Sequence, residues 1–298
     1  MRILVTGASG LIGSALLGSL RRGGHDASAL VRRPASGGGE VKWNPNAVDP
    51  APFEGADAVV HLAGANIAAG RWTPERKKVI ADSRVDSTRN VAQSIAATTR
   101  KPKVLVSASA IGFYGDRGDE LLHESSPGGS GFLAEVAREW EAAAQPAERA
   151  GIRVVLPRIG VVLSGRGGAL PKIALPFRMF MGGRVGSGGQ WMSWIELDDM
   201  VRLIVFAIEN DSVRGPVNAV APQAVTNSEF TRTLAHVLHR PAIFPAPAFA
   251  VRLAMGTEMA NELLLSSSRV EPKVALNAGF RFEYPQLHSA LARALNEP

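Results

Sequence analysis

Three glycines, Gly7, Gly10 and Gly13, follow a short apolar run and precede an amphipathic stretch. In such a strand–turn–helix, the first glycine permits a tight turn, the second lets the backbone approach a diphosphate, and the third lets the helix pack closely. The phosphates then face N–H groups at a helix N-terminus, where the dipole favours negative charge. An ordinary turn between strand and helix is the alternative. The pattern predicts a dinucleotide-binding loop made of Gly7, Ser9, Gly10, Leu11, Ile12 and Gly13.

The second expected strand, residues 25–31, ends in Arg32 and Arg33. A site for NAD usually places a carboxylate there, to bind the ribose 2′-hydroxyl. Two guanidiniums instead suit a 2′-phosphate, which arginine binds with paired hydrogen bonds, and Ser9 could donate another. We therefore expect NADP(H) rather than NAD(H). The alternative is that both arginines are solvated surface charges.

Strand and helix patterns alternate along the rest of the sequence, which is typical of a parallel sheet covered on both faces. Strands are expected at residues 56–63, 103–107 and 153–158, and helices at 11–22, 73–97, 131–149 and 197–209. Residues 164–189 are rich in glycine and are expected to be irregular. A capping box at 226–229 predicts a further helix, and short helices are expected in residues 248–295.

These elements predict an α/β fold: a Rossmann-type doubly wound parallel sheet with a smaller, mostly helical C-terminal substrate or cap part. We expect residues 1–165 to form the NADP-binding domain, and residues 197–225 to return to it. Residues 166–196 and 226–298 are expected to form the cap.

Composition narrows the functional classes. Among the 298 residues there is no cysteine, so disulfides and thiolate metal sites are excluded, which fits a cytoplasmic protein. No apolar run reaches membrane-spanning length, and the sequence opens on a strand, so we expect neither a signal peptide nor a membrane partner. The net charge of +6 is spread along the chain, and no nucleic-acid motif accompanies it. We expect a small-molecule substrate, no metal, no nucleic acid, and a monomer or homodimer.

Several motifs, the opening loop among them, together indicate a protein family. They are the loop at residues 6–13, His-Leu-Ala-Gly at 61–64, Thr-Arg-Asn-Val at 88–91, and Val-Ser-Ala-Ser at 106–109 followed by Phe-Tyr-Gly-Asp at 113–116. Together they resemble the extended short-chain dehydrogenases/reductases, in the nucleotide-sugar epimerase/dehydratase branch. The resemblance implies further cofactor-binding residues, which are Leu62, Ala63, Gly64, Ser107, Pro157 and Arg158.

A narrower resemblance covers nearly the whole chain. It rests on residues 71–73, 83–85, 107–115, 132–136, 140–141, 156–160, 266–270, 278–280 and 284–285. These segments are similar to those of uncharacterised "epimerase family proteins" with a C-terminal domain of unknown function.

The superfamily's chemistry uses a tyrosine with a lysine four residues later, whose ammonium lowers the phenol pKa. The matching helix here has neither residue. The chain has two tyrosines, Tyr114 and Tyr284, and neither is followed by lysine at that spacing. Catalysis by the usual route is therefore in doubt.

Three residues remain as catalytic candidates, and a fourth, Arg158, is a candidate for substrate binding. Ser109 follows a strand and could orient or protonate a substrate, or it could cap a turn. Tyr114 could reach the cofactor, or it could be a packed aromatic with a satisfied hydroxyl. Glu135 could transfer protons if it is buried, or it could be an exposed helix carboxylate. Arg158 could hold an anionic substrate, or it could form a salt bridge.

Two functions follow from these residues. The first is an NADP(H)-dependent oxidoreductase or epimerase-like enzyme acting on a small polar or nucleotide-linked substrate. The second is a non-catalytic NADP(H)-binding sensor, which the absent tyrosine–lysine pair motivates.

Overall fold

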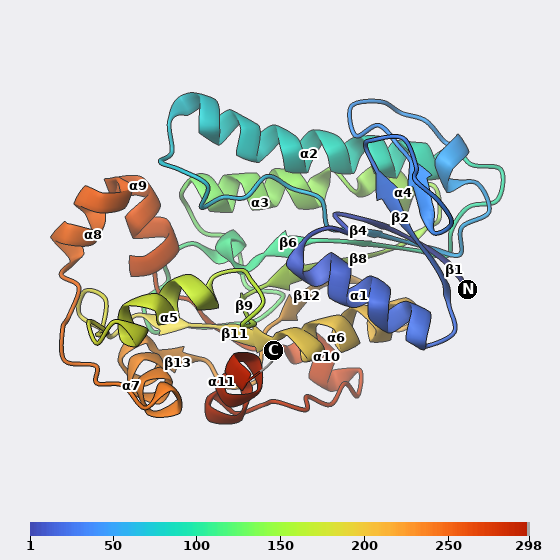
Figure 1. The fold of residues 1–298 in the computed structure, drawn as a ribbon. Coiled ribbons are helices and arrows are strands. Elements are labelled where there is room, and N and C mark those ends of the chain that lie inside the picture. The colour runs from blue at the N-terminus through green and yellow to red at the C-terminus, as the bar shows by residue number, and fades with distance from the viewer. Residues whose placement is uncertain (297–298) are drawn as a thin grey trace.

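A parallel sheet with strand order β12-β8-β5-β4-β1-β2-β3 forms the centre of the computed structural model, which describes residues 1–296 (Figure 1). Its strands are β1 (Arg2–Thr6), β2 (Asp26–Val31), β3 (Glu40–Lys42), β4 (Ala58–His61), β5 (Val104–Ser107), β8 (Arg153–Ile159) and β12 (Gly215–Ala219). A short strand, β6 (Ser109–Ala110), continues beyond β5 and also pairs with β8. Each pairing is parallel, so the carboxyl ends of the strands share one edge. The predicted doubly wound α/β fold is confirmed.

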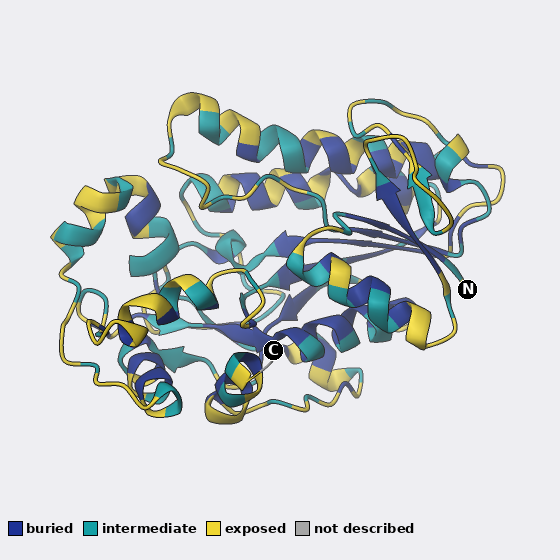
Figure 2. Cartoon of the chain, in the orientation of Figure 1, coloured by how far each residue is buried: buried dark blue, intermediate teal, exposed yellow. Residues whose placement is uncertain are grey.

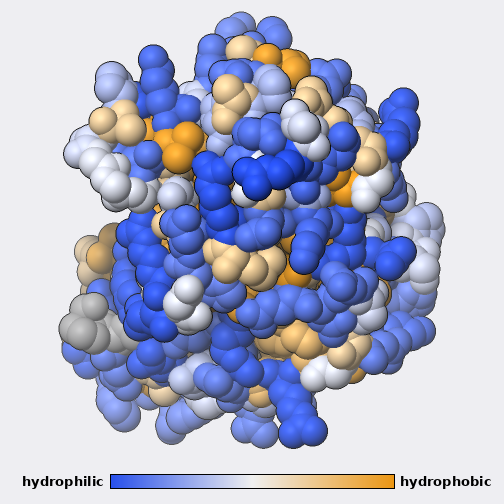
Figure 3. Space-filling view, turned by 90° about the vertical axis from the view of Figure 1, so that its right-hand side faces the viewer, coloured by the Kyte–Doolittle hydropathy of each residue, from blue (hydrophilic) through white to orange (hydrophobic). Residues whose placement is uncertain are grey.

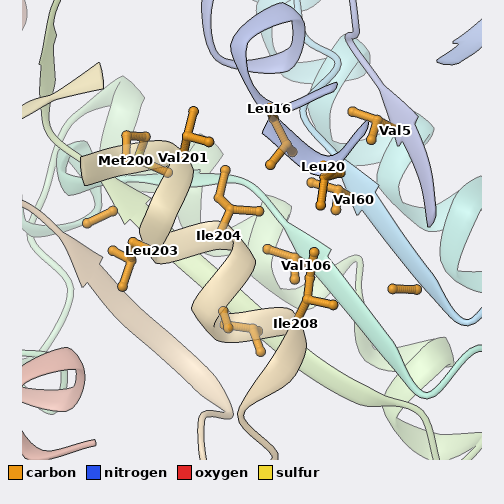
Figure 4. Close-up of a cluster of buried hydrophobic side chains, with 14 of the residues drawn as sticks. Val5, Leu16, Leu20, Val60, Val106, Met200, Val201, Leu203, Ile204 and Ile208 are labelled. Carbon is orange, nitrogen blue, oxygen red and sulfur yellow. The ribbon is translucent and has the colours of Figure 1, made fainter. Parts of the chain in front are cut away.

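Helices cover both faces of this sheet (Figure 1). One face carries α1 (Leu11–Arg22) and α6 (Leu197–Glu209), and the other carries α2 (Pro74–Ala96), α3 (Phe132–Ala142) and α4 (Gln145–Arg149). Side chains alternate across the strands, so Ile3 and Val5 pack toward α1 and α6, while Leu4 packs toward α2. Figure 4 shows the first of these clusters, and Figure 2 shows the strands buried between the helical layers.

The second half of the chain builds a smaller part beside the carboxyl edge of the sheet. Its elements include β9 (Val161–Leu163), α5 (Leu170–Arg178), β10 (Trp191–Met192), β11 (Trp194–Glu196), β13 (Val225–Thr226), α7 (Asn227–Leu238), α8 (Ala248–Met255), α9 (Thr257–Ala260), the π-helix η3 (Asn261–Leu265) and α11 (Leu287–Asn296). Trp194, Phe230 and Leu291 are fully buried in its own core cluster. This part therefore has a separate hydrophobic centre.

Part of the second half belongs to the central sheet. Helix α6 packs on α1, and β12 extends the sheet next to β8. The short helix α10 (Lys273–Asn277), from the tail expected to lie in the cap, also packs there, with Ala275 and Phe280 in the same cluster as α6. The sheet domain is thus completed by segments from three places in the second half.

Several local expectations are confirmed and others are wrong. Helix α1 and the capping box at Thr226 and Glu229 match the sequence pattern. The single helix expected at 131–149 is two helices, because Pro146 in the first turn of α4 cannot continue the α3 hydrogen-bond ladder. The segment 164–189 is not wholly irregular, since it contains α5. The strands β3 and β12 were not expected from the sequence.

The surface at the amino ends of the strands is mainly hydrophilic (Figure 3). Among the described residues, no helix combines the length and the apolarity needed to cross a bilayer. Nor do the side chains of residues 1–296 bring three histidine or acidic groups together in a cluster that could hold a metal ion.

Candidate functional site

The loop between β1 and α1 has the backbone geometry that its glycines predict. Gly7 has φ +66°, and its carbonyl accepts a 2.9 Å hydrogen bond from the Gly10 N–H. A Cβ on Gly13 would lie 2.3 Å from the Gly7 oxygen, and one on Gly7 would lie 2.7 Å from the Leu62 carbonyl. Two of the three glycines are therefore required by close packing of the loop on α1 and on the end of β4.

The N-terminus of α1 is open toward a cavity. No side chain caps this helix, and its first turn contains no acidic residue. A cavity of about 270 Å³ is lined by Ser9, Gly10 and Leu11, and also by Arg166 and Leu197. Uncapped amides and an arginine that line the same cavity fit a diphosphate, because both favour negative charge. Arg166 was not among the site residues predicted from the sequence. The sequence signal that could have indicated it is an arginine next to two glycines, soon after strand β9.

The two arginines after β2 differ in their surroundings. Arg33 binds Glu40 on β3, with Nη2–Oε1 at 2.6 Å and Nη1–Oε2 at 2.9 Å. Hydrogen bonds from Arg33 and from Ser36 lower the pKa of Glu40 to about 2. Arg32 is exposed, and within the described part of the chain it has no hydrogen bond or ion pair. Arg32 is therefore the side chain available to a phosphate, while Arg33 is held beside it.

A buried hydrogen-bond chain fixes the end of β4 against the glycine loop. The Thr6 hydroxyl accepts from the N–H groups of Leu62 and Ala63, at 3.1 and 3.3 Å, so its own proton goes to His61 Nδ1, at 2.7 Å. His61 Nε2 then donates to the Ser87 hydroxyl at 3.2 Å. This pattern needs the neutral imidazole, and burial lowers the pKa of His61 to about 4. Leu62 and Ala63 are thereby held next to Gly7, and Gly64 follows them in the chain.

Ser107 ends β5 and pairs in register with His61. Its side chain is fully buried, and among the described residues its Oγ has no hydrogen-bond partner. A buried hydroxyl without a hydrogen-bond partner destabilises the folded protein by about 1–3 kcal/mol. Such a hydroxyl at the carboxyl end of a central strand is consistent with a residue whose hydrogen-bond partner is a bound ligand. Together with the glycine loop, Ser107 meets the requirements of a dinucleotide site.

Ser109 belongs to a buried ion-pair network. Its hydroxyl donates to Glu141 Oε1 at 2.7 Å, and the same carboxylate accepts from Arg158 Nε at 2.7 Å and Nη2 at 2.9 Å. The side chain of Arg158 is 3% exposed and that of Glu141 is 11% exposed. Arg158 and Pro157 were both expected to bind the cofactor. They are neighbours on β8, and both are buried. The salt bridge is thus the alternative that the structure favours for Arg158.

Tyr114 completes this network from the 3-10 helix η2 (Ile111–Tyr114). Its hydroxyl accepts from Arg158 Nη1 at 2.9 Å and donates to Asn218 Oδ1 at 2.7 Å. Tyr114 is fully buried, and this burial raises its pKa. An ionised phenol is disfavoured there, so the geometry supports a packed aromatic with a satisfied hydroxyl.

Glu135 does not meet the condition set for it. The buried side of α3 carries Ala134, Val136, Ala137 and Trp140, and Glu135 lies off it and is exposed. Of the two alternatives for Glu135, the structure therefore favours the exposed helix carboxylate over a buried, proton-transferring group. Glu262 of η3 is the carboxylate that contacts α3, and it accepts from the Phe132 and Leu133 N–H groups at 2.9 and 2.8 Å.

The comparisons with known proteins agree with this geometry. Residues 3–220 match the model of the NAD dependent epimerase/dehydratase family, and residues 246–294 match a domain of unknown function, DUF1731. The "Epimerase family protein Mb2239" of Mycobacterium bovis is 41% identical over 298 residues, which cover 99% of this chain and 98% of that protein.

Two solved structures are similar over the sheet and the cap. The human epimerase family protein SDR39U1 (isoform 2), whose crystal structure is described as "with NADPH", has a TM-score of 0.93 and 34% identity, and 100% of each chain is covered. The nucleoside-diphosphate sugar epimerase from Corynebacterium glutamicum has a TM-score of 0.81 and 39% identity, with 98% of this chain and 57% of that chain covered. This chain therefore belongs to the NAD-dependent epimerase/dehydratase family, with the extended short-chain dehydrogenase/reductase fold and the C-terminal domain of the epimerase family proteins.

Proposed function

We propose that this protein is an NADP(H)-dependent oxidoreductase or epimerase-like enzyme that acts on a small polar or nucleotide-linked substrate. The observation that carries the proposal is the uncapped N-terminus of α1, which lines a cavity with Arg166, with Arg32 directly after the neighbouring strand β2. NADPH in the structure of the human relative supports the choice of NADP(H).

The protein's residues would bind and orient the coenzyme as follows. Gly10, Leu11 and Arg166 would hold the diphosphate, Arg32 would hold the 2′-phosphate, and Ser107 would donate a hydrogen bond at the end of β5. When bound, NADP(H) supplies or accepts a hydride.

Ser109 is the candidate for moving the proton. Its hydroxyl donates to Glu141 Oε1 at 2.7 Å, and Arg158 binds the same carboxylate, so Ser109 could pass its proton to Glu141 as it accepts one from a substrate hydroxyl. Tyr114 has no such acceptor, because its hydroxyl faces an amide oxygen and the His123 carbonyl.

The coenzyme preference is tested by titrating NADPH and NADH into the wild type and into Arg32→Ala, Arg33→Ala and Arg149→Ala. Arg149 is a matched control, since it is exposed on α4 and, among the described residues, its side chain is hydrogen-bonded only to Gln145 on its own helix. We expect Arg32→Ala to weaken NADPH binding roughly 10- to 100-fold and to leave NADH unchanged, because it removes charge-assisted hydrogen bonds to one phosphate. Equal affinity of the wild type for the two coenzymes would refute the preference.

A non-catalytic, coenzyme-sensing role is the second candidate. The supporting observation is that the hydroxyls of Ser109 and Tyr114 are both committed to a buried ion-pair network. Incubation with NADPH and a broad panel of carbonyl compounds separates the two functions. Steady oxidation that is lost in Ser109→Ala supports the enzyme, whereas tight NADPH binding without turnover on any compound supports the sensor.

A further inference from the structure

Two arginines on the first half of α2, Arg76 and Arg84, lie at the carboxyl edge of the sheet, and no carboxylate pairs with either of them within residues 1–296. Arg84 is half-buried, and its guanidinium carbon would lie 3.4 Å from a Cβ on Gly64, directly after β4. Arg76 donates to the Asn66 carbonyl in the same loop, and its Nε is buried with no hydrogen-bond partner among the described residues. Both side chains therefore face the loop that follows β4.

The contacts of Arg84 do not balance its charge. Its Nη1 donates to the carbonyl of Ile80 on its own helix at 3.0 Å, and its guanidinium lies 5.2 Å from the centre of the Trp140 ring. No ion pair to Arg84 is found among residues 1–296. Burial, and then the charge of Arg76, lower its pKa to about 10, which records how poorly this cation is compensated. Partly buried arginines normally have an anionic partner, so this one lacks a group that the protein does not supply.

Arg84 lies beside one side of α3, and the residues named here on that side are uncharged. Leu133, Ala137 and Trp140 are spaced four and three residues apart, so they share one side of that helix. Leu133 contacts Gly112 near the Ser109 strand, and Trp140 lies beneath Arg84. A tyrosine–lysine pair would need positions such as 133 and 137, which here are leucine and alanine. Arg84 thus brings a positive charge from α2 to the side of α3 that has none of its own.

Basic side chains at the start of α2 also contact the cap, and the carboxylates near them already have partners. Arg71 donates to the Leu253 carbonyl at 2.8 Å, and Lys77 pairs with Glu258 at 2.6 Å, so the start of α2 contacts α8 and α9 (Figure 1). Glu262 is already bound by backbone N–H groups of α3. The carboxylates of this part of the cap are therefore used elsewhere, and Arg76 and Arg84 remain for a ligand.

We propose that Arg84, assisted by Arg76, binds a carboxylate or phosphate group of the substrate at the carboxyl end of β4. This inference deepens the proposed function, on which it rests for the neighbouring coenzyme. Arginine suits the role because its planar fork binds either oxyanion with two parallel hydrogen bonds. The substrate class is therefore an anionic small molecule, held between α2 and α3.

The test uses inorganic phosphate and malonate as probes, titrated calorimetrically at constant ionic strength into the full chain saturated with NADPH. The variants are Arg84→Gln, Arg76→Gln and the control Arg89→Gln, an exposed arginine on the same helix that pairs with Asp86. We expect Arg84→Gln to weaken binding of at least one probe by about 30-fold or more, and Arg76→Gln by about tenfold. Arg89→Gln should change it by less than about threefold.

Each other outcome overturns the inference. A wild type that binds both probes more weakly than about 10 mM, or variants that bind as the wild type does, would leave Arg84 as a packing residue. If Arg84→Gln weakens NADPH rather than the probes, the guanidinium serves the coenzyme and not the substrate. Arg76→Gln decides the matter if circular dichroism shows that Arg84→Gln is unfolded. NADPH is titrated by itself before the probes, so a failure of the proposed coenzyme is seen separately. If NADPH does not bind, the probes are titrated into the protein without it.

Discussion

The buried network around Arg158 gives the sharpest prediction of stability. Glu141→Ala removes the carboxylate that accepts three hydrogen bonds, two from Arg158 and one from Ser109. The Arg158 side chain is 3% exposed, so water cannot replace the lost partner. Breaking a buried pair by removing one member costs about 3–5 kcal/mol, and we expect Glu141→Ala to lower the free energy of unfolding by that amount.

Urea unfolding followed by circular dichroism at pH 7 measures this loss. With a slope of about 3 kcal/mol per molar urea, the unfolding midpoint should fall by roughly 1–1.7 M. Asp82→Ala is the control, because it breaks an exposed pair with Lys78 whose side chains are 45% and 75% exposed. That variant should lose less than about 0.5 kcal/mol.

A double variant separates loss of the pair from loss of packing. Glu141→Leu with Arg158→Met removes both charges, and replacing a buried pair with apolar residues is often neutral or stabilising. The double variant should therefore be more stable than Glu141→Ala. A loss below about 1 kcal/mol for Glu141→Ala would refute the reasoning, since Arg158 would then tolerate burial without its partner.

Three further predictions concern the loop, the pH dependence and the cap. Gly13→Ala places a Cβ 2.3 Å from the Gly7 oxygen and should weaken NADPH binding by about tenfold or more, measured by titration against the wild type. His61, with its pKa lowered to about 4, contributes stability that is complete above about pH 6.5 and is lost as the pH falls toward 4, because the unfolded chain takes up the proton first. Unfolding at pH 7.5 and pH 5.0 should therefore differ by about 2 kcal/mol more in the wild type than in His61→Gln, and equal differences would contradict the neutral imidazole. Glu262→Ala removes the acceptor for two N–H groups of α3, so the amides of Phe132 and Leu133 should exchange faster with deuterium, while those of α1 should not change.

Local features of the sequence were sufficient to predict the coenzyme loop. The strand, the three glycines and the helix are contiguous, so their geometry depends on backbone sterics and not on distant packing. The same holds for the capping box at Thr226 and Glu229, whose partners are three residues apart. Strand β12 was not predicted because it begins with Gly215 and Pro216, residues that usually indicate a turn. They are tolerated here because β12 is an edge strand.

Contacts between segments that are far apart in the sequence could not be predicted from it. Glu141 and Arg158 stand on α3 and β8, and nothing in either segment shows that the two side chains meet. Arg166 reaches the start of α1 only because the chain after β9 returns to the carboxyl edge of the sheet. Glu135 illustrates the opposite error, since its helix was placed correctly but its direction depends on which side of α3 packs.

The hydroxyl groups at the carboxyl edge of the sheet can be ranked by the hydrogen bonds that each is still able to form with a ligand. Tyr114 is fully bonded and is disfavoured as an ionised base. Ser109 donates its hydroxyl proton to Glu141, a carboxylate that Arg158 also binds. Ser107 has no partner at all within the described residues, and so has the most to gain from a ligand. Binding by Ser107 and proton transfer by Ser109 are thus separable functions of two neighbouring positions, and substituting each by alanine should change coenzyme affinity in the first and turnover in the second.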